Sequence, residues 1–296
     1  MNSVFKIPGV DQTAGGNNVS VTMEGHISYV STLAISGNRL YSGSGDNTIR
    51  VWDLSTLKEI GIMTGHTDSV LSLAVSEDRL YSGSVDHTIK VWDLSTLSEV
   101  ACLKGHKDCV RSLVVDGGRL YSGSLDHTIK VWDLTTLTEV GCMKGHTDCV
   151  RSLAVSGERL YSASLDRTIK VWDLNSLTEV GCLTGHVDGV CALVIADNAL
   201  YTGSIDHTIK IWELNTLTEV VSLTGHSQGG IVLALAVANG RLYACSDDHT
   251  IRVWDLSSFV EVCSITGHRD WVHSMVVSGK RLFSGSADST IKAHFL

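Results

Sequence analysis

Histidine, serine and aspartate recur along this chain in a way that is typical of hydrolytic enzymes. The dipeptide Gly-His occurs seven times, and an Asp follows six of these histidines at one constant spacing, as Asp46 follows His26. In the remaining case, Asp248 follows His226 at a spacing that is longer by two positions. A catalytic triad needs these residue types in one place, where His takes a proton from a nucleophilic Ser and Asp orients the His. Seven equivalent sets do not make one site, so we expect them to be structural hydrogen-bond partners.

One segment also fits a nucleophile motif. Residues 225–229 read GHSQG, the pattern G-x-S-x-G, in which Ser227 would be the nucleophile of a serine hydrolase. That motif needs a parallel strand before the Ser, a helix after it and an oxyanion loop of the HGGG type. Here strand-like segments flank the Gly-His pair, and the sequence contains no HGGG-type loop. We therefore predict a protein that is not an enzyme, with a serine hydrolase at Ser227 as a remote alternative.

Eight cysteines and several histidines raise the question of a metal site. No C-x-x-C pair occurs, and Cys102, Cys142 and Cys182 recur once per Gly-His unit, which is unlike the close ligand spacing of zinc sites. We predict that the cysteines are small buried thiols. His87, His127, His207 and His249 each follow an Asp in a predicted hairpin turn, so we expect no metal shared between repeats and no cofactor. The recurring Glu of each predicted outer strand is interpreted as a solvated edge charge.

Composition excludes other classes of function. The chain has 296 residues with 23 basic and 32 acidic side chains, a net charge of −9, which argues against direct nucleic-acid binding. The longest wholly apolar run, residues 231–238, is much shorter than the about 20 residues that span a bilayer, so no membrane segment is expected. The start of the sequence lacks an apolar signal region. Reduced thiols and a location in the cytoplasm or nucleus are the resulting expectations.

The elements that position these residues follow from the repeat. Successive Gly-His pairs are evenly spaced from His26 to His226, and the last interval, to His268, is longer because two residues are inserted near Gly229. Within one unit, residues 70–75, 80–84, 88–94 and 99–103 have the alternating, β-branched and aromatic character of short strands separated by polar turns. Four strands per unit, repeated seven times, predict an all-β fold of radially arranged blades.

Seven Gly-His and five Trp-Asp pairs in register give the chain its resemblance to the WD-repeat β-propeller family. The resemblance covers residues 19–296 and implies a seven-bladed β-propeller of four-stranded antiparallel blades. The last unit ends at Leu296 after three strands, and residues 19–23 have the phase of a fourth strand with no first three. The family's ring closure, in which an N-terminal strand completes the last blade, explains both ends. Residues 1–18 are Gly/Asn-rich and are predicted to be a flexible tail.

The resemblance also implies a polar chain in each blade, from the Trp indole through a strand hydroxyl and the Gly-His imidazole to the turn Asp. Incomplete sets, in which a member is replaced, predict looser closure of the sixth and seventh blades. Ser44 and its equivalents lie on the same strand face as Ser42 and are alternative hydroxyls. The assigned sets are His26, Ser42, Asp46 and Trp52; His66, Ser82, Asp86 and Trp92; His106, Ser122, Asp126 and Trp132; His146, Ser162, Asp166 and Trp172; His186, Thr202, Asp206 and Trp212; His226, Asp248 and Trp254, with Ala244 for the hydroxyl; and His268, Ser284 and Asp288, with His294 for the Trp.

Partners of such propellers usually dock around the central mouth, where the resemblance places three positions per blade. They are predicted to include the paired arginines Arg111 and Arg151 and the aromatic residues Tyr29 and Trp271. Trp, Tyr and Arg are typical interface anchors. An apolar arc and His273 complete this predicted surface. Its apolar arc consists of Val85, Leu125, Leu165 and Ile205.

These features predict a non-enzymatic scaffold that binds a protein or peptide partner. Arg111 and Arg151, each in a CVRSL context, resemble the arginines with which F-box-type ubiquitin-ligase propellers hold phosphorylated degrons. The short turn before RLYSGS is similar to propellers of TRAF-type ubiquitin ligases and myosin heavy-chain kinases. The resemblance implies an acidic or phosphorylated partner and a monomeric propeller acting as substrate receptor in a ubiquitin-ligase or signalling assembly. Leu125 and Leu165 depart from the degron-binding pattern, which can have arginine there, and the sequence shows no F-box, RING or kinase domain.

Two other interpretations stay open. A chromatin reader would bind a basic histone tail at the mouth, which Asp247 favours and the two arginines disfavour. The arginines could equally be ordinary rim charges, since the third and fourth units are nearly identical and duplication alone explains the pair.

Overall fold

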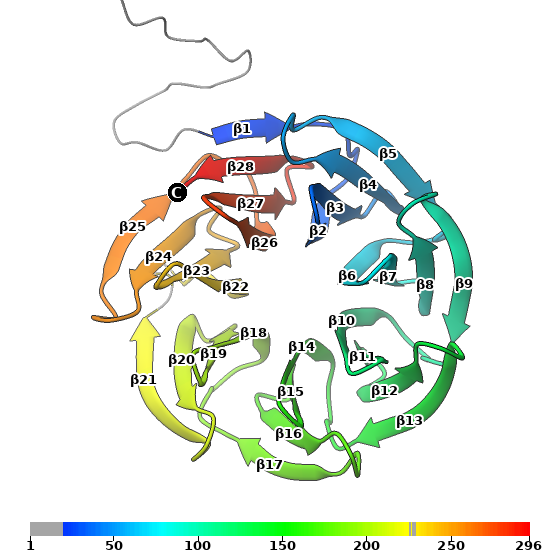
Figure 1. Ribbon diagram of the computed structural model, residues 1–296. Helices are drawn as coiled ribbons and strands as arrows, with labels where there is room; N and C mark the ends of the chain where they lie inside the picture. Colours follow the sequence, from blue (N-terminus) through cyan, green and yellow to red (C-terminus); the bar gives the residue numbers. More distant parts are fainter. Residues whose placement is uncertain (1–19, 225, 227–228) are drawn as a thin grey trace, which may run out of the picture.

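Seven four-stranded antiparallel sheets are arranged around a central axis in the computed structural model (Figure 1), which describes residues 20–224, 226 and 229–296. The fold predicted from the repeat is therefore confirmed. The predicted tail, Val19 and Ser227 lie outside the described residues. In the described part of the chain, no helix has the length and apolarity needed to cross a membrane.

Each blade runs from an innermost to an outermost strand in chain order, except the seventh, where the outermost strand is the first of the chain. The first four blades are β2 (Val30–Ser36), β3 (Arg39–Ser44), β4 (Thr48–Asp53) and β5 (Glu59–Thr64); β6 (Val70–Ser76), β7 (Arg79–Ser84), β8 (Thr88–Asp93) and β9 (Ser98–Lys104); β10 (Val110–Asp116), β11 (Arg119–Ser124), β12 (Thr128–Asp133) and β13 (Thr138–Lys144); and β14 (Val150–Ser156), β15 (Arg159–Ser164), β16 (Ile169–Asp173) and β17 (Glu179–Leu183). The others are β18 (Val190–Ala196), β19 (Ala199–Ser204), β20 (Thr208–Glu213) and β21 (Thr218–Thr224); β22 (Val232–Ala238), β23 (Arg241–Ser246), β24 (Ile251–Asp255) and β25 (Glu261–Ile265); and β26 (Val272–Ser278), β27 (Arg281–Ser286), β28 (Ile291–Phe295) and β1 (Ser20–Met23).

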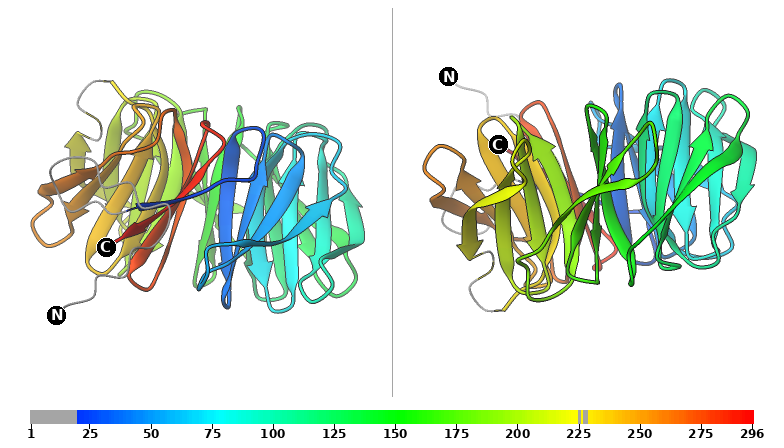
Figure 2. Two further views of the ribbon diagram at one scale, coloured as in Figure 1. Left: turned by 90° about the horizontal axis from the view of Figure 1, so that it is seen from above. Right: turned by 90° about the horizontal axis from the view of Figure 1, so that it is seen from below.

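The blades stand side by side, so that their connections emerge on two opposite faces (Figure 2). What we call the upper face carries the loop before each innermost strand and the hairpin between the second and third strands. In the third blade these two connections are joined by the bond from Leu125 N–H to the carbonyl of Cys109, at 2.9 Å. The hairpins turn at a residue with positive φ, such as His87 at 67°, which agrees with the predicted turns.

The hydrophobic core lies between neighbouring blades. Residues of the first blade, including Tyr41, Val51 and Met63, pack against Leu80 and Trp92 of the second, and six further interfaces repeat this arrangement. The second strand of a blade is buried on both faces, as β3 is from Leu40 to Ser44, because a neighbouring blade covers each face. Because every blade covers the next, the ring must close for all sheets to be covered.

Strand β1 provides this closure by pairing with β28, in the register Ser20 to His294 and Met23 to Ile291. Met23 is 3% exposed and packs in a cluster that contains Ile291 of the seventh blade and Val30 and Trp52 of the first. The predicted N-terminal strand is thus present from Ser20 onward, and it pairs the outer edge of β28.

Candidate functional site

A polar chain connects four side chains inside each of the first five blades. In the second blade, the indole Nε1 of Trp92 donates to Ser82 Oγ at 2.8 Å, and Ser82 Oγ lies 2.7 Å from His66 Nε2. The Nδ1 of His66 is 2.7 Å from Asp86 Oδ2. Equivalent contacts join the predicted members of the first, third, fourth and fifth blades, with Thr202 as the hydroxyl of the fifth.

The two candidate hydroxyls have separate roles. Ser42 contacts His26 and Trp52, as predicted, whereas Ser44 Oγ donates to the Ser28 carbonyl at 3.2 Å and accepts from Asp46 N–H at 3.1 Å. One hydroxyl therefore belongs to the polar chain and the other holds the hairpin.

The electrostatics of these sets fit hydrogen-bonded structure. Burial alone would raise the pKa of Asp86, but hydrogen bonds from His66 and Thr88 outweigh burial and hold that pKa well below its usual range. In the first blade, burial lowers the pKa of His26 in spite of the Asp46 carboxylate. An ionised Asp beside a neutral imidazole satisfies the buried donors, and the Ser82 hydroxyl belongs to a side chain that is 0% exposed, so it is out of reach of a substrate.

The two blades with replaced members behave differently from each other. In the sixth, His226 Nδ1 contacts Asp248 Oδ2 at 2.7 Å, but its Nε2 is buried and has no hydrogen-bond partner among the described residues, because Ala244 has no hydroxyl. In the seventh, the prediction of an incomplete set was wrong, because His294 Nε2 lies 2.9 Å from Ser284 Oγ and substitutes for the indole. His268 contacts Ser284 and Asp288 at 2.8 Å each.

The outer-strand Glu residues are exposed, as predicted, and each of six is in addition ion-paired. A Lys or Arg on the neighbouring strand reaches each of them, for example Lys90 Nζ to Glu99 Oε2 at 2.6 Å. The strand pairing brings the two side chains together across adjacent strands. The prediction that the cysteines are buried was wrong for Cys182 and Cys263, which lie on the outer strands and are exposed.

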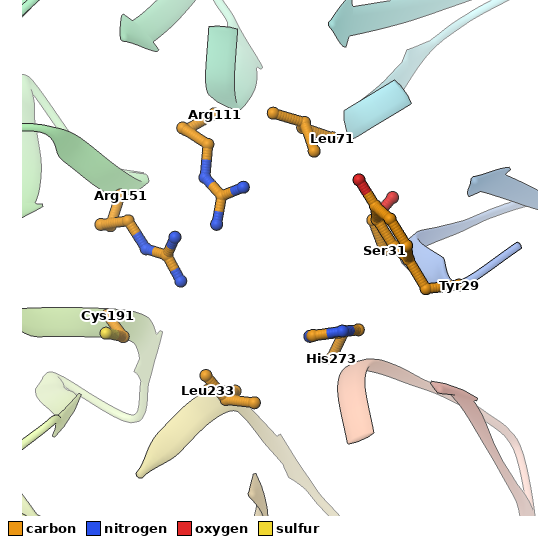
Figure 3. Close-up of a pocket in the computed structure, with 8 residues that line it drawn as sticks. All are labelled: Tyr29, Ser31, Leu71, Arg111, Arg151, Cys191, Leu233 and His273. Atoms are coloured by element: carbon orange, nitrogen blue, oxygen red, sulfur yellow. The ribbon is translucent and has the colours of Figure 1, made fainter. Parts of the chain in front are cut away.

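A central pocket, called the channel below, is lined by one equivalent position of each blade together with Tyr29, which precedes β2. In each innermost strand the register shifts across a β-bulge, and the extra residue is the one that points into the channel, as Arg111 does between Val110 and Ser112. A bulge re-aims a side chain in this way. The channel encloses about 130 Å³ (Figure 3) and is lined by Tyr29, Ser31, Leu71, Arg111, Arg151, Cys191, Leu233 and His273.

Arg111 and Arg151 extend from adjacent blades into this channel, with their guanidinium groups side by side (Figure 3). Among the described residues, no carboxylate forms an ion pair with either of them. Burial and the charge of Arg151 lower the pKa of His273, so the imidazole is neutral at neutral pH. The channel therefore carries two positive charges in a protein whose net charge is −9.

The other predicted mouth residues lie around the channel. Trp271 is 46% exposed and meets the His273 ring edge-on at 6.1 Å, while Tyr29 meets the same ring at 5.9 Å. Leu125 is 37% exposed and, like Leu165, does not belong to the channel lining. A ligand that touched both arginines and leucines would have to extend from the channel onto the upper face.

Sequence reasoning missed one cluster at the upper face. His87 of the second blade lies beside Asp108 and Cys109 of the third, with one ligand-type atom from each within 4.8 Å of the other two. Burial, aided by the neighbouring Asp108, raises the pKa of Cys109 to about 11. The sequence signal was present as an Asp-His turn in one unit and an Asp-Cys pair in the next, but only the packing of adjacent blades brings them together.

Comparisons with known proteins agree with this architecture. Seven segments match the family described as WD domain, G-beta repeat: residues 17–53, 57–93, 97–133, 137–173, 177–213, 217–255 and 259–293. A short segment of 37 residues, 12% of the chain, is 51% identical to zinc finger CCCH domain-containing protein 62 of Arabidopsis thaliana and spans 9% of that protein. The crystal structure of the computationally designed protein Ika8 is similar over 93% of this chain and 98% of its own, with a TM-score of 0.74 and 30% identity. The chain therefore belongs to the WD-repeat family of β-propellers.

Proposed function

We propose that this propeller is a non-enzymatic scaffold that binds an acidic segment of a protein partner at the channel mouth. The observation that carries the proposal is the pair formed by Arg111 and Arg151, which share a channel and form no ion pair within the described residues. A guanidinium binds carboxylate or phosphate with two parallel hydrogen bonds, and two adjacent forks suit one such group. Low-dielectric walls strengthen this attraction.

The size of the channel limits what enters it. About 130 Å³ is small beside the roughly 300–1,000 Å³ of pockets for drug-sized ligands, so one acidic side chain fits better than a folded segment. The flanking residues of the partner would then lie on the upper face, against exposed Leu125 and Trp271. An apolar side chain next to the acidic group would complete the contact.

The wider role follows from the likeness of the CVRSL arginines to those of degron-binding propellers. We place the protein, as a monomeric propeller, among substrate receptors of ubiquitin-ligase or signalling assemblies in the cytoplasm or nucleus. In such an assembly the propeller supplies recognition and another component supplies the chemistry. A histone-tail reader is less favoured, because two unpaired guanidinium groups repel a basic segment.

The test is a titration of three peptides that differ at one central residue, which is Glu, phosphoserine or Gln. The variant Arg111→Glu/Arg151→Glu should weaken acidic peptides by at least ~30-fold and reduce the salt dependence, because truncating one partner of a buried charge pair costs about 2–5 kcal/mol. Lys58→Glu/Lys280→Glu makes the same change of charge at exposed positions of the face opposite to the upper face, between β4 and β5 and between β26 and β27, and should leave affinity nearly unchanged.

Four results would contradict the proposal. Equal affinity for the Gln peptide would show that the acidic group is not recognised. Equal losses in the two double variants would show a long-range charge effect. Tighter binding of a basic peptide would support the histone-tail reader, and labelling of Ser227 by a fluorophosphonate would support the hydrolase.

A further inference from the structure

The cluster of His87, Asp108 and Cys109 joins two blades at the upper face. His87 is at the tip of the hairpin between β7 and β8, where its φ of 67° sets the direction of the side chain. Asp108 and Cys109 lie in the loop that leads into β10. The Nε2 of His87 is 3.9 Å from Asp108 Oδ1, and the three ligand-type atoms lie within 4.8 Å of one another. Imidazole, carboxylate and thiol therefore converge from two separate repeats.

This convergence is specific to one boundary between blades. The next boundary repeats the residue types as His127, Asp148 and Cys149, yet in the described residues only the first set comes together. Cys149 is 1% exposed, whereas Cys109 is half-buried, so the thiol of the second set faces the interior. The chain thus offers one convergent set and one matched set that does not converge.

We propose that His87, Asp108 and Cys109 bind a zinc ion, with a fourth position left to water or to a group of a bound partner. Nitrogen, oxygen and sulfur ligands at about 2.0–2.3 Å are the preferred set for Zn²⁺, and three protein ligands are typical of open sites. Tetrahedral geometry at those lengths places donor atoms roughly 3.3–3.8 Å apart, which half-exposed side chains reach by small rotations. The proposal does not depend on the acidic-ligand function, because it uses none of the channel residues.

The carboxylate is already oriented, since Cys109 N–H donates to Asp108 Oδ1 at 2.7 Å; the matched pair Cys149 and Asp148 repeats this bond at 2.6 Å, so it is the convergence of all three side chains that distinguishes the site. A ligand held by such a bond loses less freedom on binding a metal.

The site ties the hairpin of the second blade to the loop of the third. Zinc binds only the folded arrangement of these three side chains, so it should raise the midpoint of thermal unfolding. Neither blade alone contains the complete ligand set, so zinc depends on the packing of the two blades. The unfolding midpoint is therefore a second readout besides affinity.

The experiment is a titration of the full chain with Co²⁺, kept reduced by a phosphine. We expect one equivalent to bind with thiolate-to-cobalt charge-transfer absorption, and Zn²⁺ to displace it. Cys109→Ser should remove that absorption, and His87→Ala should weaken Co²⁺ binding by at least ~tenfold. The matched changes Cys149→Ser and His127→Ala should alter neither the absorption nor the affinity.

Absence of charge-transfer absorption in the unaltered protein would overturn the proposal, as would its loss in Cys149→Ser with retention in Cys109→Ser. Equal weakening by His87→Ala and His127→Ala would also overturn it. If Cys109→Ser does not fold, His87→Ala still decides the question, because its exposed side chain lies outside the core. A rise in unfolding temperature with Zn²⁺ that His87→Ala abolishes would support the site.

Discussion

The hydroxyl of Ser284 lies 2.9 Å from the Nε2 of His294, in the position that an indole nitrogen occupies in the first five blades. Ser284 has one proton and also lies 2.8 Å from the Nε2 of His268. The consistent assignment is that His294 donates to Ser284 and Ser284 donates to His268. The Nδ1 of His294 then carries a buried lone pair, and it has no hydrogen-bond partner.

Replacing His294 by Trp should stabilise the seventh blade. A Cβ on Gly65 would meet Trp92 at 3.2 Å, whereas a Cβ on the equivalent Gly267 would meet only aliphatic carbons of Lys292, so room for an indole is present. We expect His294→Trp to raise the free energy of unfolding by about 0.5–2 kcal/mol, which is typical of cavity filling. Urea unfolding at neutral pH measures the change, and a loss of stability would show that the indole does not fit.

The same variant should remove part of the sensitivity to acid. Burial lowers the pKa of His294 to about 3, while the unfolded chain has the ordinary value of 6.5. Between these two pH values the unfolded state binds a proton that the folded state does not, so stability falls as the pH falls through this window. His294→Trp should flatten that decline. An unchanged slope in His294→Trp would show that another group causes the decline.

Ala244→Ser should repair the polar chain of the sixth blade. The added hydroxyl would lie next to His226 Nε2, which is buried without a partner. A gain of about 1 kcal/mol in the free energy of unfolding is expected, because a buried acceptor becomes satisfied. Ala163→Ser is the matched control: Ala163 is equally buried but occupies the position of Gly83 in the second blade, where added atoms meet Val110. The control should lose stability, and equal effects of both changes would contradict the explanation.

The sequence predicted the ring and most of its polar chains because both depend on a spacing that recurs from one Gly-His unit to the next. It did not predict that His294 completes the polar chain in place of the indole, since a pattern of residue types hides the fact that any ring N–H at that point can donate. Nor did it predict the contact of His87 with Cys109, which depends on side-chain directions across a boundary between blades. Arg111 and Arg151 were expected at the mouth, but the bulge that turns them into the channel is visible only in the strand pairing.

Met23→Ala should destabilise the whole ring and not only its seventh blade. Met23 is 3% exposed and lies between the seventh and first blades, so the loss of its side chain leaves a cavity at the closure. The expected cost is about 2–5 kcal/mol. Met63→Ala is the matched change, since Met63 faces Ile49 in β4 as Met23 faces Ile291 in β28. Comparable costs in urea would show that the closing strand contributes as much packing as a strand continuous with its blade.

Removal of residues 1–23 tests the closure more severely. Without β1 the edge of β28 is unpaired, and an exposed edge promotes association with other chains. We expect a lower unfolding temperature and a shift to larger species in size-exclusion chromatography. Unchanged stability and an unchanged elution volume would contradict the role assigned to β1.

Acidic peptides should bind more tightly as the pH falls, through His273. Burial and the positive charge of Arg151 lower the pKa of His273, while Asp270 acts in the opposite direction. An anion between Arg111 and Arg151 offsets the repulsion from Arg151, so the pKa of His273 rises in the complex. The complex then binds a proton that the free protein lacks, and affinity should rise about three- to tenfold between about pH 7 and pH 5.5.

A sulfated peptide is the proper ligand for this measurement, because its charge does not change in this range. His273→Gln should abolish the increase, whereas a pH dependence that persists in this variant, or an affinity that falls with acid, would place the titrating group outside the channel.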